Sequence, residues 1–168
     1  MSEKVAPDTA SENFSYESEK ELQLVSFKLA EEEFGVEILR VREINRMVTV
    51  TPVPESPTFV EGVIHLRGKA IPIVDLRKRM GLSGRAHDED TRIIVVELDD
   101  QLVGFVVDSV SEVLRIHTSI TESPPAMVAG MDEECITAVG KLGDRLLVLL
   151  DLAEVFSEEE QIAIKKAA

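Results

Sequence analysis

Cysteine is almost absent from this sequence. Cys135 is the single cysteine in 168 residues, which excludes an internal disulfide bond and a metal site built from several cysteines. Three acidic residues, 132–134, directly precede it, and neighbouring negative charges disfavour a nucleophilic thiolate. These features indicate a protein of a reducing, cytoplasmic compartment whose cysteine has no catalytic role.

Positive charge and aromatic side chains are also scarce. The chain has 18 basic against 32 acidic residues, a net charge of −14, 4% aromatic residues and no tryptophan. Such a charge repels anionic partners such as nucleic acid or an anionic membrane surface. A nucleic-acid-binding barrel also needs a basic groove with stacking aromatic rings. We therefore expect a protein partner and no nucleic acid.

Long apolar runs and catalytic motifs are missing as well. No run approaches the roughly 20 apolar residues of a membrane helix, and the start MSEKVAPDTASENF lacks the apolar stretch of a signal peptide. We expect a soluble protein that is not exported. The sequence has no GxSxG, GxGxxG, Walker or HExxH motif. The histidines His65, His87 and His117 lie in separate segments, so no metal or cofactor site is expected.

What the sequence does have is apolar alternation. Residues 1–21 are polar and acidic and are expected to form a disordered tail. From Leu22 onward, apolar residues such as Val25, Phe27 and Leu29 alternate with polar ones, and a second alternating run follows the acidic residues 31–33. This period of two predicts a β-hairpin. With 44% apolar residues, the chain can build one domain or two small lobes around a shared core.

The next segment carries weaker signals. Ile38, Val41 and Ile44 are spaced three apart, which predicts one or two helical turns. Ser56 followed by Pro57 predicts a short helix that ends near Gly62.

Residues 67–69, Arg-Gly-Lys, interrupt an apolar stretch. Gly68 favours a tight turn between strands over residues 63–66 and 70–74, with Arg67 at the hairpin tip. Because Pro72 cannot donate a hydrogen bond, the second strand should be an edge strand or carry a bulge there.

The second half of the chain repeats the first. A shift of 69 residues places Val25 on Ile94, and Phe34-Gly35-Val36 on Val103-Gly104-Phe105. With a few inserted residues, KAIPIVDL at Lys69 is echoed by RLLVLLDL at Arg145. We infer two β-rich units, residues 22–82 and 92–156, that form small barrels, because closure removes exposed strand edges. Ser157 and Glu160 form a capping box, so residues 157–168 are expected to form a C-terminal helix.

Three aspartates and Arg67 allow two interpretations each. Asp75 and Asp151 follow apolar strands at equivalent repeat positions, and a carboxylate pair could serve a hydrolase. An aspartate in this place more often caps the next turn, and the same choice applies to Asp108. Arg67 is either a solvated turn residue or a partner-binding side chain; a structural Arg67 would pair with Asp75 or Asp108.

Four ordered motifs carry a family resemblance. The stretches LVSFKLAEEEFGVEILRVREI, FVEGVIHLRGKAIPIVDLRKRMG, VGFVVDSVSEVLRI and LGDRLLVLLDL resemble the CheW family of bacterial chemotaxis coupling proteins over nearly all of residues 22–156. The resemblance implies a mainly β fold of two intertwined five-stranded SH3-like barrels. It also implies a non-enzymatic adaptor, located in the cytoplasm at receptor arrays beneath the inner membrane, that bridges chemoreceptor tips to the regulatory domain of the histidine kinase CheA.

The resemblance also implies which residues bind partners. Carried onto this sequence, the partner-binding positions are Val41, Glu43, Ile44, Gly62, Arg67, Gly104, Asp108 and Val113. One residue departs from the family pattern, because His65 stands where asparagine is usual. A CheW-like adaptor of another chemosensory pathway, one that controls pili or a second messenger, has the same sequence features.

Overall fold

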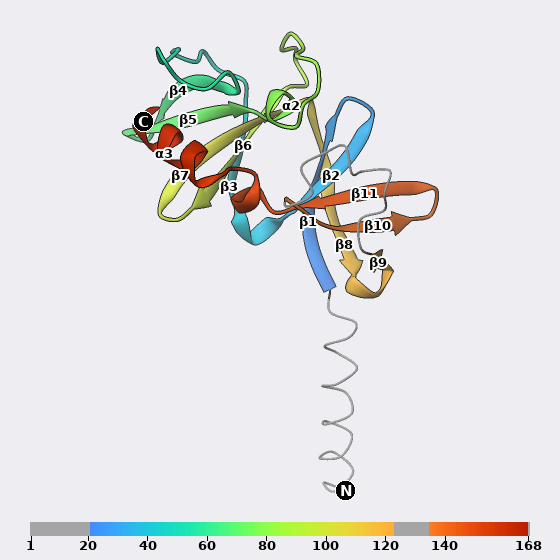
Figure 1. The fold of residues 1–168 in the computed structure, drawn as a ribbon. Coiled ribbons are helices and arrows are strands. Elements are labelled where there is room, and N and C mark those ends of the chain that lie inside the picture. Colours follow the sequence, from blue (N-terminus) through green and yellow to red (C-terminus); the bar gives the residue numbers. More distant parts are fainter. Residues whose placement is uncertain (1–20, 123–134, 168) are drawn as a thin grey trace, which may run out of the picture.

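The protein is mainly β and consists of two sheets that lie side by side (Figure 1). This computed structural model describes residues 21–122 and 135–167. The tail expected over residues 1–21 lies outside the described residues, except that Glu21 already begins the first strand.

Each sheet has an edge-to-edge order that differs from the chain order. The first sheet contains, in spatial order, β8 (Ser109–His117), β1 (Glu21–Leu29), β2 (Glu32–Glu37), β11 (Arg145–Leu150), β10 (Ile136–Leu142) and β9 (Thr121–Glu122). The second contains β3 (Val41–Arg46), β6 (Arg92–Leu98), β7 (Gln101–Val107), β5 (Lys69–Asp75) and β4 (Val60–Leu66). The sheets are therefore six- and five-stranded rather than both five-stranded, and the extra strand is the two-residue β9.

The two halves of the chain exchange strands. β1 and β2 lie in the first sheet, but β3, β4 and β5 cross to the second; β6 and β7 lie in the second, but β8, β10 and β11 cross back. The repeat shift converts the order β8-β1-β2-β11-β10 into β3-β6-β7-β5-β4. The parallel pairs also correspond, because Leu149 faces Gly35 in one sheet and Ile73 faces Gly104 in the other. The sheets are related by the sequence repeat, and neither forms from one repeat alone.

Each sheet closes towards a barrel in the same way, by backbone pairing between its outer strands. In the second sheet, the chain beyond β3 reaches Thr51, whose backbone N–H and C=O both bond to Val63 of β4, at 2.9 and 2.8 Å. In the first sheet, β8 continues through the 3-10 turn η2 (Thr118–Ile120) into β9, which pairs with β10. Both closures join the two outer strands and leave less backbone available for edge-to-edge aggregation.

The largest apolar cluster lies between the sheets and draws residues from both. Phe27 stacks on Phe34 at a ring-centroid distance of 5.8 Å, and Phe105 stacks on Phe156 at 5.7 Å. All four rings are buried in this cluster. Since each fully buried large apolar side chain contributes about 1.5–3 kcal/mol, this shared core holds the two sheets together.

Of the two expected helical segments, the first shrinks to one 3-10 turn and the second is absent from the described residues. Residues 38–46 form a single 3-10 turn, η1 (Ile38–Arg40), and then the strand β3, which pairs with β6. The spacing of three misled because the alternation in β3 places Val41 and Glu43 inward and Ile44 outward. Ser56 starts no helix: its hydroxyl donates to the Val53 carbonyl, and the chain stays irregular until β4.

The prediction for Pro72 is also wrong. β5 lies between β4 and β7 and is not an edge strand. Pro72 is tolerated because the parallel ladder to β7 begins at the next residue, Ile73. The register shift of this hairpin lies on β4, between Val60 and Gly62.

Aspartates cap the short helices that follow β5 and β11. The Asp75 carboxylate accepts a hydrogen bond from the Lys78 backbone N–H (3.4 Å) at the start of α2 (Leu76–Arg79). The Asp151 carboxylate accepts one from the Ala153 N–H (3.0 Å) at the 3-10 turn η4 (Leu152–Glu154). The capping interpretation of both aspartates is thus confirmed.

The helix α3 (Glu158–Ala167) begins at a reciprocal capping box. The Ser157 N–H donates to the Glu160 carboxylate (2.8 Å), and the Glu160 N–H donates to the Ser157 hydroxyl (3.2 Å). Ile164 packs this helix against the shared core. In Figure 1, the chain after β11 crosses to the second sheet, where α3 lies beside β4 and β5.

Candidate protein-binding surfaces

Arg67 and Glu43 meet where the second sheet closes. Arg67 Nη1 lies 3.2 Å from Glu43 Oε2, and the two side chains are 79% and 22% exposed. The pair joins the tip of the β4–β5 hairpin to β3, at the opposite edge of the sheet order. Arg67 and Gly68 both have positive φ, 53° and 77°, as a two-residue hairpin turn requires. The partner of Arg67 is therefore Glu43, and neither Asp75 nor Asp108.

Ile44 and Val113 are exposed apolar side chains at equivalent repeat positions. Ile44 lies on β3, the edge of the second sheet, and is 39% exposed; Val113 lies on β8, the edge of the first sheet, and is 56% exposed. Val41, at the start of β3, packs instead against the shared core. Ile44 follows Glu43 in β3, so Ile44 and the Arg67–Glu43 pair lie along the same edge strand. Val113 marks the edge of the other sheet.

Gly62 and Gly104 are buried and shape the backbone rather than a surface. A Cβ on Gly62 would lie 2.0 Å from the Thr51 carbonyl oxygen, and its φ is +146°. A Cβ on Gly104 would lie 2.6 Å from Ile73 Cδ1 and 2.8 Å from Ile93 Cγ2. Gly62 allows the strand closure at Thr51, and Gly104 allows β7 to pack against its neighbours.

Asp108 is a nearly buried acceptor for several donors. Arg77 donates from Nε and Nη2 to its two carboxylate oxygens at 2.8 and 2.7 Å, and the Ala30 backbone N–H donates at 2.8 Å. Burial disfavours the charged form, but these hydrogen bonds outweigh it and lower the pKa of Asp108 below its usual value. The hydrogen bond to Asp108 also raises the pKa of Arg77. Asp108 ties the β1–β2 turn of the first sheet to α2 beside the second, which is a structural role.

The carboxylates proposed for a hydrolase are not brought together. Asp75 and Asp151 each cap their own turn and line separate hollows of the structure. The neighbour of Asp75 is Glu61, whose pKa is raised by burial and by a hydrogen bond to Asp75. In the described part of the chain, no three histidine, cysteine or acidic residues are placed to hold a metal ion. No helix there combines the length and apolarity needed to cross a membrane.

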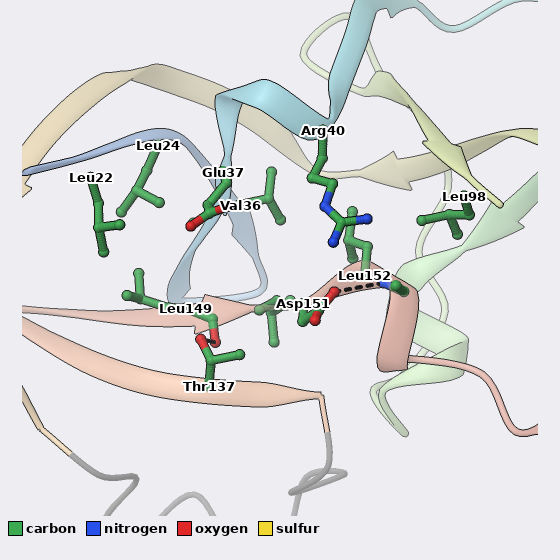
Figure 2. Close-up of a pocket in the computed structure, with 13 residues that line it drawn as sticks. Leu22, Leu24, Val36, Glu37, Arg40, Leu98, Thr137, Leu149, Asp151 and Leu152 are labelled. Atoms are coloured by element: carbon green, nitrogen blue, oxygen red, sulfur yellow. Dashed lines mark hydrogen bonds between the residues drawn. The ribbon is translucent and has the colours of Figure 1, made fainter. Parts of the chain in front are cut away.

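A groove of ≈ 200 Å³ opens beside the first sheet (Figure 2). We call it the open groove. It is lined mainly by apolar side chains of β1, β2, β11 and η4, with polar groups at its border: Leu22, Leu24, Gly35, Val36, Glu37, Arg40, Leu98, Thr137, Leu149, Leu150, Asp151, Leu152 and Ala153. In Figure 2, Leu22 and Leu24 face Leu149, and Arg40 reaches in from η1. Sequence reasoning missed this groove, because its walls come from both ends of the chain.

Most of the chain matches a known family. Residues 23–160 match the model of the CheW-like domain. The chain belongs to the CheW family. It is 36% identical to the chemotaxis protein CheW of Klebsiella aerogenes over 146 residues, which cover 87% of this chain and 88% of that protein. It is also 36% identical to the chemotaxis protein CheW of Thermotoga maritima over 151 residues, covering 88% and 93%.

A solved structure of the CheW family has the same fold. The crystal structure of the scaffolding protein CheW from Thermoanaerobacter tengcongensis is 39% identical in sequence and superposes with a TM-score of 0.76. The similarity covers 83% of this chain and 90% of that one. The predicted mainly β fold of two intertwined SH3-like barrels is therefore confirmed.

His65, the departure from the usual CheW pattern, is exposed on β4 and pairs across the hairpin with Ala70. It is exposed two residues from Arg67, so the substitution changes the surface near the hairpin tip and lies outside the buried core. Cys135 is buried in the shared core, and its carbonyl accepts a hydrogen bond from the Asp151 N–H at 2.8 Å. This cysteine is therefore part of the apolar core.

Proposed function

We propose that this chain is a non-catalytic adaptor that couples chemoreceptors to the histidine kinase CheA. The observation that carries the proposal is the match to the CheW-like domain over most of the chain, residues 23–160. The adaptor acts in the cytoplasm, at receptor arrays beneath the inner membrane. It binds the kinase and the receptor, and these two partners need two separate surfaces.

The kinase binds through its regulatory domain, which the family resemblance describes as CheW-like itself. A strand edge can pair with another sheet, and the edge strands β3 and β8 carry the exposed apolar side chains Ile44 and Val113. Protein interfaces combine an apolar centre with a polar rim, and arginine is enriched among their anchor residues. Glu43 and Arg67 supply that charge beside Ile44.

The receptor binds with its helical hairpin in the open groove. An amphipathic helix places its apolar face into an apolar groove, with anchor residues one turn apart. Leu22, Leu149 and Leu152 offer such a groove, and Arg40 stands at its border. Val41, Gly62, Gly104 and Asp108 act indirectly in this scheme, because they shape the strands that carry the contacts.

Two substitutions separate these surfaces. Val113→Asp changes an exposed side chain on β8, and Thr137→Trp places a large ring in the open groove from an exposed position. Calorimetric titration against the kinase regulatory domain and against a receptor hairpin fragment should show opposite selectivity. Val113→Asp should weaken kinase binding by about thirtyfold, equivalent to about 2 kcal/mol, and leave receptor binding unchanged; Thr137→Trp should do the reverse. If wild type binds neither fragment at micromolar concentration, the adaptor function is wrong.

A further inference from the structure

The open groove has a counterpart in the second sheet. The repeat shift of 69 residues that aligns β1 with β6 places Leu22 on Thr91, and the strand-end aspartates Asp151 and Asp75 correspond. Leu22 and Asp151 line the open groove, while Thr91 and Asp75 line a second hollow. The two hollows therefore occupy equivalent places in the two sheets.

The counterpart hollow is nearly closed, and a chain segment closes it. Its volume is ≈ 10 Å³, against ≈ 200 Å³ for the open groove. Arg85, Ala86 and His87, which belong to the segment that leads into β6, line it. Arg85 is held there by Asp108, at 3.2 Å from Nη1 to Oδ2. In the second sheet, the segment before β6 thus covers the hollow.

The same shift identifies the residues that would cover the open groove of the first sheet. The segment that leads into β1 is the N-terminal tail, and Tyr16 corresponds to Arg85. The residue that corresponds to Asp108 is Leu39. Leu39 is 92% exposed, more than any other exposed large apolar side chain of the described residues. An ion pair between Arg85 and Asp108 in one half would match an apolar contact between Tyr16 and Leu39 in the other.

The aromatic residues of the chain support this match. The sequence has six phenylalanines and one tyrosine, and the five phenylalanines in the described part are all buried. The remaining two aromatic residues, Phe14 and Tyr16, stand in the polar tail, two positions apart. This spacing is the one that places two side chains on the same side of an extended segment. An apolar cavity of about 150 Å³ accommodates a benzene ring, so the open groove has room for one.

The length of the connecting chain also fits. Tyr16 is six residues before Leu22, which lines the groove, and six extended residues span about 20 Å. Tyr16 can therefore fold back to any part of the groove without a change in β1.

The charges at the groove border match those of the tail. Arg40 has no ion-pair or hydrogen-bond partner among the described residues, and Glu17, directly after Tyr16, carries the opposite charge. Glu37, which also lines the groove, is negatively charged. The tail offers it Lys20, which stands two residues before the groove residue Leu22. Docking of the tail thus offers both border residues a partner of opposite sign.

We infer that residues 14–18 of this chain occupy the open groove, with the Tyr16 ring against Leu39. The tail then covers the open groove of the first sheet, as residues 85–87 cover the equivalent hollow of the second sheet. This docking does not depend on the proposed function. Only its consequence rests on that function: a receptor hairpin that uses the open groove has to displace the tail.

Tyrosine fluorescence tests the docking without a label. Because the chain has one tyrosine and no tryptophan, its tyrosine emission reports on Tyr16 alone. Acrylamide, a neutral quencher, is titrated into the full chain and into a free peptide of residues 1–22. If the tail is docked about nine-tenths of the time, quenching in the full chain is about tenfold weaker, because only the undocked fraction is reached.

Leu39→Asp and Ile162→Asp form a matched pair of variants. Both replace an exposed apolar side chain with a carboxylate. Ile162→Asp should keep the wild-type melting curve, and Leu39→Asp should lose no more than the few degrees that docking of the tail contributes. Leu39→Asp should restore the quenching of the free peptide, and Ile162→Asp should retain the protection. Equal quenching of wild type and peptide overturns the inference, and so does protection that survives Leu39→Asp. Protection that is lost on dilution to nanomolar protein overturns docking within one chain, because it indicates a second copy.

Discussion

Arg67 and Glu43 form an ion pair across the line where the second sheet closes, with 3.2 Å between Nη1 and Oε2. The two residues are 24 positions apart in the chain and lie on opposite edges of the sheet order, so only barrel closure brings them together. The pair sits beside Ile44, on the face proposed for the kinase regulatory domain. It is exposed enough to contribute little to stability, about 0–1 kcal/mol.

Arg67→Glu should therefore separate binding from folding. The melting temperature should stay close to wild type, because an exposed substitution usually costs within about 0.5 kcal/mol. Affinity for the kinase regulatory domain should fall about thirtyfold, since losing an interface anchor costs about 2 kcal/mol. Lys69→Glu, which reverses another exposed charge of the hairpin, is the control and should bind normally. Wild-type affinity in Arg67→Glu, for both kinase and receptor, would make Arg67 a solvated turn residue.

Asp108 should make the protein sensitive to acid. Its pKa is lowered in the folded chain, so its stabilising effect is present above the unfolded carboxyl pKa of about 3.9 and is lost as pH falls through the folded pKa. Urea unfolding at pH 6 and pH 3 should show a smaller loss of stability for Asp108→Asn than for wild type. An equal loss in both proteins would assign the acid sensitivity to other carboxylates.

Removal of the Asp108 carboxylate should greatly reduce stability. Arg77 and Asp108 are only 13% and 10% exposed, and breaking a buried ion pair from one side costs about 3 kcal/mol. Asp108→Ala should therefore lower the free energy of unfolding by about that amount. Glu33→Ala is the comparison, because its partner Arg145 is 48% exposed, and its cost should stay below about 1 kcal/mol.

Gly62 and Gly68 should respond differently to alanine. Both have positive φ, but a Cβ on Gly62 meets the Thr51 carbonyl at 2.0 Å, whereas a Cβ on Gly68 meets nothing within 4 Å. Gly68→Ala should cost about 1–2 kcal/mol from the left-handed backbone alone. Gly62→Ala should cost more, because the bridge between Thr51 and Val63 has to open. Denaturant unfolding measures both, and equal costs would show that the strand closure adapts without strain.

Removal of residues 1–20 tests the consequence of tail docking. A tail docked about nine-tenths of the time stabilises the fold by about 1.4 kcal/mol, so truncation should lower the melting temperature by about 3–5 °C. A disordered tail that makes no contact predicts no change. Truncation should also raise affinity for a receptor hairpin about tenfold. If Tyr16 is protected but truncation leaves receptor affinity unchanged, the receptor uses another surface.

Much of the architecture was predictable from local patterns. Alternation gave the β1–β2 hairpin, Gly68 gave the turn with Arg67 at its tip, and the Ser157–Glu160 capping box begins α3. The family motifs identified the two-barrel fold, which the CheW structure of Thermoanaerobacter tengcongensis confirms. The spacing of Ile38, Val41 and Ile44 failed because a spacing of three over so few residues fits a helix and a turn followed by a strand equally well.

The sequence by itself determined the repeat, the turns, the caps and the alternation that turns each side chain towards the core or away from it. These depend on neighbours a few residues away, whose preferences act within one element. Tertiary structure decided which strands pair across the repeats, that Arg67 meets Glu43, that Arg77 meets Asp108, and that the open groove forms between β1 and η4. Those choices depend on closing each sheet with strands from both halves of the chain, and no local period encodes a partner 24 or more residues away.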